Sequence, residues 1–266
     1  MTAAEPTVAL SEVRILGSRV HLVSAAQVVD HVENWIAGRD PLAAPRCRQV
    51  VVTGFHGLWA AHQDSRLRDI LNAADIWAPD GIAPILVAHL RGRKDAQRAP
   101  GLEIMQEFFG RAQARGYSSY FYGDTEAVLC SLRERLERVY PGHRVAGMYS
   151  PPFRPLTPAE DDEVIERINA ARPDVLWVGL GTPKQDQWIH DRLDRLQVPV
   201  AIGVGAAFGF MAGAVRRCPE WMGRLGFEWV YRFLKEPRKL WRRDLIDGPR
   251  FLVSLARELM GGRRSE

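Results

Sequence analysis

Residues 174–185 have the sequence Asp-Val-Leu-Trp-Val-Gly-Leu-Gly-Thr-Pro-Lys-Gln, an apolar run followed by a glycine-rich turn. The run at 174–178 is strand-length and apolar, which predicts a buried strand. Proline is favoured at the first position of a helix, so a helix is expected from Pro183 to Leu196. Another apolar run at 198–204 predicts the next strand. This order of strand, turn, helix and strand indicates a parallel sheet.

The same alternation extends back along the chain. We expect strands at 13–16, 19–22, 49–53, 74–77, 117–122 and 143–148. We expect helices at 24–38, at 56–72 with a break near 65, after Gly81 as far as about residue 90, at 102–115, at 126–139 and at 158–171. The pattern predicts an α/β fold, a Rossmann-like, mostly parallel sheet with helices on both faces.

After residue 214 the pattern becomes helical and basic. Residues 216–266 contain 13 Lys/Arg and 7 Asp/Glu, a balance of +6, whereas the preceding residues contain 23 and 25. We therefore divide the chain into an α/β domain, residues 1–214, and a basic helical appendage, residues 215–266. A basic appendage favours an anionic partner such as a phosphate group or a membrane surface. Nucleic acid is not expected, because no known nucleic-acid-binding module is recognisable.

Composition indicates the cellular compartment and argues against a metal site. Three widely spaced cysteines, Cys47, Cys130 and Cys218, favour a reducing compartment over a disulfide framework. No Asp-x-Asp pair and no His/Cys cluster has ligand spacing, so we expect neither a metal nor a cofactor. The first ten residues do not resemble a signal peptide, and no apolar run reaches the roughly 18 residues of a membrane span. We expect a cytoplasmic protein that works at a membrane surface.

Ligands of parallel α/β sheets bind outside the carboxyl ends of the strands. Asp80 follows a predicted strand and is a candidate general base for a substrate hydroxyl. A lone Asp before a glycine such as Gly81 is more often a turn residue or a helix cap. His56, just beyond Thr53, is the second candidate base, and a lone histidine of this kind is more often structural. By the same rule, Gly123 at the end of a predicted strand is a candidate for binding substrate.

Two glycine-rich turns are candidates for binding phosphate. At Gly179 and Gly181 the backbone is open to an anion, Lys184 adds charge, and Gln185 adds a donor and an acceptor. An ordinary turn between a strand and a helix has the same composition, and the Walker A ending is missing. The second turn, 203–209, has the spacing G-x-G-x-x-x-G, a weak match to a dinucleotide fingerprint.

The appendage interleaves aromatic and basic residues between 229 and 243. On a helix, five basic side chains gather on one side: Arg232, Lys235, Lys239, Arg242 and Arg243. Such a face suits a pyrophosphate or an anionic membrane. A solvated basic face over an aromatic core is the plainer alternative.

Taken together, these segments resemble the WecG/TagA/CpsF glycosyltransferase family from about Val13 to Asp244. The matching segments, in order, are 71–81 with Pro-Asp-Gly at 79–81, 98–103, 179–188, 203–213, 219–221 and 228–237. Each segment is a weak match by itself, but the ordered set is specific.

The resemblance implies an inverting, metal-independent transfer from a UDP-sugar to a polyprenyl-pyrophosphate-linked sugar. The sugar is of N-acetylmannosamine type or a hexose. The setting is cell-surface polysaccharide synthesis at the inner face of the plasma membrane, with homo-oligomerisation left open. Asp80 matches the family's proposed base. The expected substrate-binding residues are Arg98, Gln185, Arg232, Lys239 and Arg242 from the family, with Thr53, Gly123, Gly179, Gly181 and Lys184 from the strand ends.

The chain departs from the family pattern at several positions. Val52 and Gly54 replace a Thr-x-Asn pair, and His56 is the candidate to supply the lost polar contacts. Gly209 stands where the family often has Asp. The remaining departures are Glu103, Asp186 and Lys239. These changes bear on the identity of the donor more than on the reaction class.

Two other functions are compatible with parts of the sequence. An NADP-type oxidoreductase would use the turn at 203–209, with Arg216 and Arg217 near the 2′-phosphate. A non-catalytic membrane-surface protein would use the basic appendage alone. The ordered motifs favour the glycosyltransferase.

Overall fold

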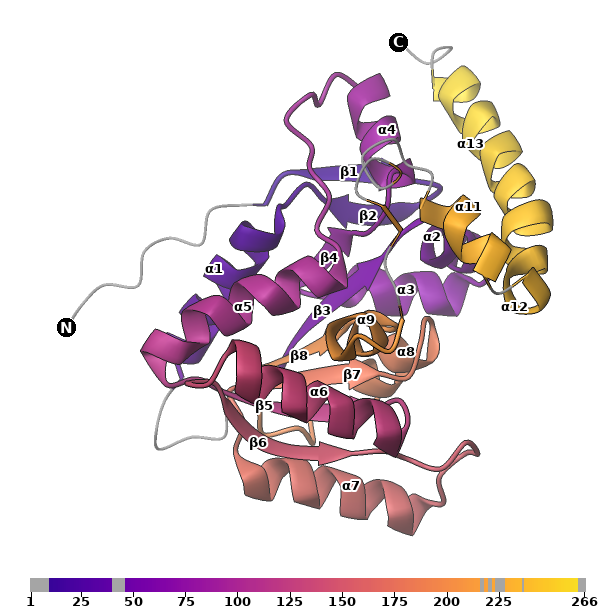
Figure 1. The fold of residues 1–266 in the computed structure, drawn as a ribbon. Helices are drawn as coiled ribbons and strands as arrows, with labels where there is room; N and C mark the ends of the chain where they lie inside the picture. The colour runs from indigo at the N-terminus through magenta and orange to yellow at the C-terminus, as the bar shows by residue number, and fades with distance from the viewer. Residues whose placement is uncertain are drawn as a thin grey trace.

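A computed structural model describes residues 10–39, 46–215, 218–219, 222, 228–235 and 237–262. Its centre is a six-stranded sheet with the order β4-β3-β8-β7-β5-β6, in which every pairing is parallel (Figure 1). The strands are β3 (Arg48–Thr53), β4 (Ile76–Pro79), β5 (Ser118–Gly123), β6 (Arg144–Tyr149), β7 (Val175–Gly179) and β8 (Val200–Gly203). The predicted α/β class is confirmed.

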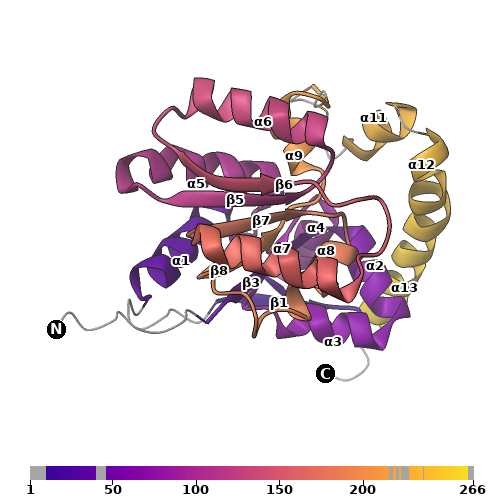
Figure 2. The ribbon, with the colours of Figure 1, turned by 90° about the horizontal axis from the view of Figure 1, so that it is seen from below.

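Helices cover both faces of the sheet. One face carries α1 (Ala25–Ala37), α5 (Gly101–Arg115), α6 (Glu126–Val139) and α9 (Ala207–Ala212). The other carries α2 (Phe55–Gln63), α3 (Ser65–Ala73), α7 (Pro158–Ala171) and α8 (Lys184–His190). Figure 2 shows the sheet between the layer of α5 and α6 and the layer of α7. All strands therefore end at one edge, where the turns of both layers meet.

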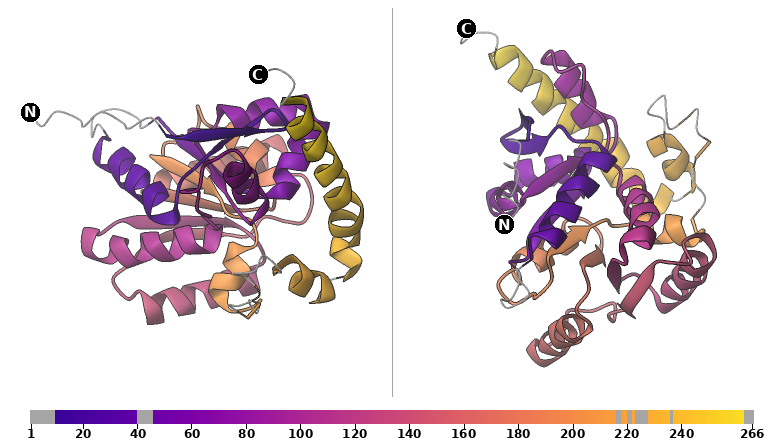
Figure 3. Two further views of the ribbon diagram at one scale, coloured as in Figure 1. Left: turned by 90° about the horizontal axis from the view of Figure 1, so that it is seen from above. Right: turned by 90° about the vertical axis from the view of Figure 1, so that its left-hand side faces the viewer.

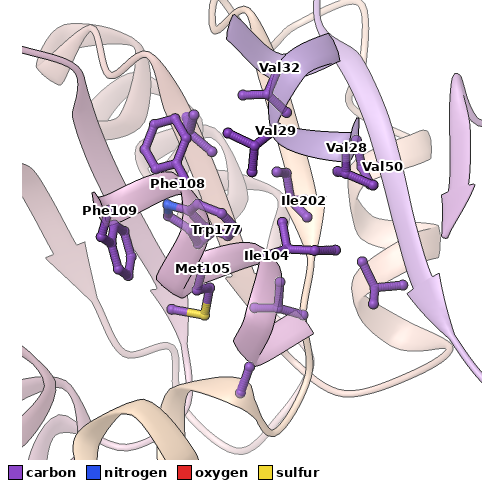
Figure 4. Close-up of a cluster of buried hydrophobic side chains, with 14 of the residues drawn as sticks. Val28, Val29, Val32, Val50, Ile104, Met105, Phe108, Phe109, Trp177 and Ile202 are labelled. Atoms are coloured by element: carbon purple, nitrogen blue, oxygen red, sulfur yellow. The ribbon is translucent and has the colours of Figure 1, made fainter. Parts of the chain in front are cut away.

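The largest apolar core lies between the sheet and the first helix layer. Phe108 and Phe109 of α5 pack on Trp177 of β7, with ring centroids 5.5 and 5.6 Å away (Figure 4). This packing fixes the position of α5 on the sheet. At the start of α5, Gly101 lies so close to β8 that a Cβ there would be 3.2 Å from Val204. The segment that leads into α5 is thereby brought to the strand ends.

A second core joins elements from the two ends of the described chain. It contains the antiparallel hairpin β1 (Glu12–Ile15) and β2 (Ser18–His21), α4 (Ala83–Leu90) and α13 (Gly248–Gly262). Phe251 of α13 is only 2% exposed and meets the Phe55 ring at 6.0 Å. The Glu258 carboxylate accepts hydrogen bonds from the backbone N–H of Leu16 and from Arg91, both at 2.6 Å.

The last helix therefore shares a core with the α/β unit (Figures 1 and 3). It is preceded by α11 (Glu228–Lys235), α12 (Pro237–Trp241) and a π-helix, η1 (Arg242–Asp247). The appendage is helical where it is described. The domain boundary at residue 214 stays a prediction. Phe251 and Leu255 of the proposed appendage lie in a core that they share with the α/β unit.

Most predicted elements occur close to their predicted positions. α6 and α7 have the predicted bounds, and both begin at a threonine cap, Thr125 and Thr157. β4 begins and ends two residues later than the predicted strand 74–77, and as an edge strand it tolerates Pro79. α8 ends at His190 instead of Leu196, and the chain continues in tighter turns.

A buried polar pair lies between α8 and the sheet. Asp186 and Gln49 are fully buried, and Gln49 donates from Nε2 to the backbone carbonyl of Asp186 at 2.9 Å. Neither carboxylate oxygen of Asp186 receives a hydrogen bond of good geometry from a described residue. Burial raises the pKa of Asp186 to about 8, against a smaller opposing effect of the Gln185 side chain. Asp186 is therefore mostly protonated at neutral pH.

We predict that Phe251→Ala lowers the free energy of unfolding by about 3–5 kcal/mol, the usual cost of deleting a buried phenyl ring. Leu252→Ala, at a neighbouring side chain that is 61% exposed, is the matched control and should change stability by no more than about 0.5 kcal/mol. Urea unfolding of both variants measures the difference. Equal, small effects would mean that α13 is a separable appendage.

We also predict that Asp186→Asn stabilises the fold increasingly as the pH rises from 5 to 8. In this range the unfolded chain has already released the Asp186 proton, whereas the folded protein retains it up to a pKa of about 8. The wild type therefore loses stability with rising pH, and the asparagine variant does not. The gain at pH 8 should be at least about 1 kcal/mol, because one pKa unit corresponds to about 1.4 kcal/mol. Thermal unfolding at several pH values, with the exposed Asp69→Asn as control, tests this; parallel stability curves would contradict it.

Candidate active site

A large cleft of about 1420 Å³ opens at the carboxyl ends of β5, β7 and β8. We call it the strand-end cleft. Its floor includes Gly179, Gly181 and Gly205, and the proline-rich segment 151–158 forms an outer wall. Gly209, Tyr231 and other residues of 205–235 close the side toward α9 and α11. The cleft thus lies at the carboxyl ends of the strands, where ligands of parallel α/β sheets bind.

The turns after β5 and β7 touch each other through glycine. Gly123 has a φ of +125°, and a Cβ there would lie 2.6 Å from the carbonyl of Gly179. A Cβ on Gly179 would in turn lie 2.7 Å from the Phe208 ring. Larger residues at these positions would push the turns apart. Gly179 lines the cleft, whereas Gly123 does not line it and packs against Gly179.

Gln185 joins the turns after β7 and β8. Its side-chain oxygen accepts hydrogen bonds from the N–H of Gly181 at 3.1 Å and of Gly205 at 2.9 Å. Its amide nitrogen lies 3.5 Å from the hydroxyl of Thr182. Gln185 is fully buried. Its side-chain oxygen, which the sequence predicts to contact substrate, links the turns after β7 and β8. Its direct contact with substrate stays a prediction.

Four cationic side chains of the described residues line the strand-end cleft: Arg154, Lys184, Arg192 and Lys235. Arg154 is exposed and pairs with Glu160. Lys184, which the sequence predicted, is exposed beside the turn after β7. Lys235 of α11 lies 5.8 Å from the centre of the Tyr231 ring. Arg192 follows α8 and was not predicted. Residues four apart lie on the same face of a helix. Arg192 is four residues after Trp188 and eight after Lys184, and this spacing could have indicated that all three line the cleft.

A second group of candidates lies at the ends of β3 and β4. The backbone N–H of Asp80 donates to the carbonyl of Thr53 at 3.2 Å. The N–H of Ala99, next to Arg98, donates to Pro79 at 2.8 Å. Thr53 is buried and packs on Gly57, whereas Asp80 and Arg98 are half-buried. The structure thus brings together three of the predicted residues, which we call the β3–β4 group.

His56 begins α2 beside this group and is covered by the C-terminal segment. Burial lowers the pKa of His56, and the nearby Arg243 lowers it further, against the opposing charges of Asp247 and Asp244. Arg243 also lies 6.0 Å from the Phe55 ring and pairs with Asp244 at 2.6 Å. A neutral imidazole has the protonation state that a general base needs.

The strand-end cleft and the β3–β4 group are separate. Asp80 is not among the residues that line the cleft. In the sheet, β3 and β8 lie between β4 and β7. Neighbouring strands are about 4.8 Å apart, so Asp80 at the end of β4 is about 14 Å from the end of β7, whereas the ends of β3 and β8 are neighbours. A ligand that contacts both Asp80 and the turn after β7 must be extended.

Several predicted residues lie outside the described part of the structure. These are Arg216, Arg217 and Trp221, together with the side chains of Arg232 and Lys239. Arg242 is exposed on η1. Within the described residues, no three His, Cys, Asp or Glu side chains gather as a metal site. No helix in the same part of the chain is long and apolar enough to cross a membrane.

Known proteins resemble this chain over most of its length. A Bacillus spizizenii protein named N-acetylglucosaminyldiphosphoundecaprenol N-acetyl-beta-D-mannosaminyltransferase is 32% identical over 195 residues, which is 73% of each protein. Proteins of the same name from Bacillus subtilis and Staphylococcus aureus are 29% identical over 201 and 189 residues. These matches cover 75% of both chains for the first, and 71% of this chain and 72% of the relative for the second. The model of the glycosyl transferase WecG/TagA/CpsF family matches residues 13–265, and the chain belongs to this family.

Proposed function

We propose that this glycosyltransferase transfers a sugar, of N-acetylmannosamine type or a hexose, from a UDP-sugar to a sugar linked to a polyprenyl pyrophosphate. The transfer inverts the anomeric centre and needs no metal ion. The relatives' names indicate the acceptor and the sugar for those proteins. The observation that carries the proposal is the strand-end cleft, with its glycine turns and cations, next to the β3–β4 group.

An extended nucleotide-sugar would use both groups. The diphosphate would lie over the turns at Gly181 and Gly205, where Lys184 and Lys235 supply positive charge. The sugar would then point across β8 and β3 toward Asp80. Inverting transfer is a direct displacement, so a base beside the anomeric carbon must take the proton of the acceptor hydroxyl. Asp80 takes that role, and Arg98 stabilises the departing diphosphate.

The acceptor is a lipid, so the enzyme must work at a membrane surface, which we propose to be the inner face of the plasma membrane. The C-terminal helices have large apolar side chains that are at least half exposed: Trp241, Leu245, Leu252, Val253 and Met260. Basic residues lie among them, including the exposed Arg242, Arg250 and Arg257. Apolar and basic side chains on one helical segment favour contact with anionic lipid.

The oxidoreductase alternative is less well supported by the geometry. The dinucleotide fingerprint follows the first strand of its sheet and opens the first helix. The turn at 203–209 follows β8, the last strand of the sheet in sequence.

We predict that the full chain adds one glycosyl unit from a UDP-sugar to a polyprenyl-pyrophosphate-linked N-acetylglucosamine. Mass spectrometry of the acceptor after incubation with a panel of UDP-sugars identifies the donor. Product formation should be unchanged in EDTA, because cationic side chains neutralise the leaving diphosphate. Loss of product in EDTA that magnesium or manganese restores would refute metal independence. If NADPH stabilises the protein and no UDP-sugar is used, the oxidoreductase is favoured.

We further predict that Asp80→Asn lowers turnover by roughly 10²–10⁴-fold, the usual effect of a lost general base. UDP affinity should stay within about a factor of two, because Asp80 does not line the cleft. Asp95→Asn, at a carboxylate that is 73% exposed, is the matched control and should behave as wild type. His56→Ala is the decisive comparison: if it alone abolishes turnover while Asp80→Asn is active, His56 is the base.

A further inference from the structure

Arg192 is held rigidly in the wall of the strand-end cleft. Its Nε donates to both oxygens of Asp161, at 2.8 and 2.9 Å, and one terminal nitrogen, Nη1, donates to the backbone carbonyl of Trp188 at 3.1 Å. The guanidinium lies 5.0 Å from the centre of the Trp188 ring, whose own N–H donates to Asp161 at 3.2 Å. The Arg192 side chain is only 20% exposed. A cation held in this way loses little conformational entropy when a ligand binds.

One edge of this guanidinium is free to bind a ligand. The other terminal nitrogen, Nη2, has no hydrogen-bond partner among the described residues, although Arg192 lines the cleft. The guanidinium has five N–H donors in one plane and no acceptor. A ligand at this position must therefore offer acceptors, such as carbonyl or phosphate oxygens, and not amino groups.

The position of Arg192 indicates which part of the donor it meets. It lies on the α7–α8 side of the cleft, where Tyr122 at the end of β5 and Trp188 also line the wall. The sheet order puts β5 and β7 on the far side of β8 and β3 from Asp80. With the sugar at Asp80 and the diphosphate at the glycine turns, the nucleobase is the part of the donor that reaches Arg192.

We infer that Arg192 selects the nucleobase of the donor by donating hydrogen bonds to the carbonyl oxygens of uracil. This inference rests on the proposed function, in which the cleft holds a nucleoside diphosphate. Uracil presents a carbonyl oxygen where cytosine presents an amino group, and an amino group would face the N–H donors of Arg192. The segment 151–158, with Phe153 91% exposed, supplies an apolar cover for a flat base.

Cytosine is the sharpest competitor, because it has the same size as uracil and differs at this group. We expect the wild-type chain to bind UDP about 10- to 100-fold more tightly than CDP, the usual discrimination from such a contact. In Arg192→Gln the UDP-to-CDP affinity ratio should fall to within about threefold, mainly through weaker UDP binding. Isothermal titration calorimetry of the full chain with UDP and with CDP measures both affinities.

Arg195→Gln is the matched control. Arg195 lies 3.7 Å from the same Asp161 and pairs with Asp162 at 2.5 Å, but it does not line the cleft. Its replacement should leave the UDP-to-CDP ratio unchanged. Arg192→Lys is the second variant for the case that the glutamine variant does not fold. It retains the charge beside Asp161 but has no planar fork, and the ratio should fall again.

The outcomes separate this inference from the proposed function. If Arg192 only fastens α7 to α8, its variants weaken UDP and CDP equally and the ratio stays at the wild-type value, which overturns the inference. In that case UDP-sugar transfer by the wild type still supports the proposed function. If the wild type binds neither nucleotide, the proposed function fails and this inference fails with it.

Discussion

The side-chain oxygen of Gln185 is the point on which the geometry of the cleft depends. It accepts hydrogen bonds from two backbone N–H groups, of Gly181 and Gly205, which lie in the turns after β7 and β8 and both have positive φ. A buried N–H group without a partner costs about 1–3 kcal/mol, so one oxygen stabilises both turns at once. The residues that face the cleft, Lys184 and Trp188, are one position before and three positions after this anchor. Their placement follows from how Gln185 fixes the start of α8.

The proposed reaction centre and the proposed nucleotide-binding cleft lie at the ends of different strands. The backbone N–H of Asp80 donates to Thr53, and that of Ala99, next to Arg98, donates to Pro79. The π-helix η1 meets α2 beside His56, and Arg243 adds charge at that point. A substrate that spans the two regions is therefore aligned by elements from the middle and the end of the chain.

The sequence predicted the elements well wherever local signals decide them. The threonine caps Thr125 and Thr157 mark α6 and α7, and glycine turns mark the strand ends. The β3–β4 group was also accessible, because it follows from the rule that parallel strands end at one edge. The structural role of Arg192 was not accessible, because it depends on Asp161, 31 residues earlier in the chain. The burial of Gln185 and Asp186 was equally hidden, since polar residues after a glycine turn look exposed in sequence.

The shared core of the hairpin and α13 has a consequence for the biosynthesis of the protein. Residues 12–21 are made early, whereas Phe251, Leu255 and Glu258, which share their core or bond to Leu16, are made much later. The hairpin can pack on β4, α2 and α4 as soon as these elements are made, because they precede α13 in the chain. Leu16 obtains its hydrogen-bond partner in α13 only after residue 258 has been synthesised. Packing of α13 against α2 is therefore a late event in the order of synthesis, and it also brings η1 to His56.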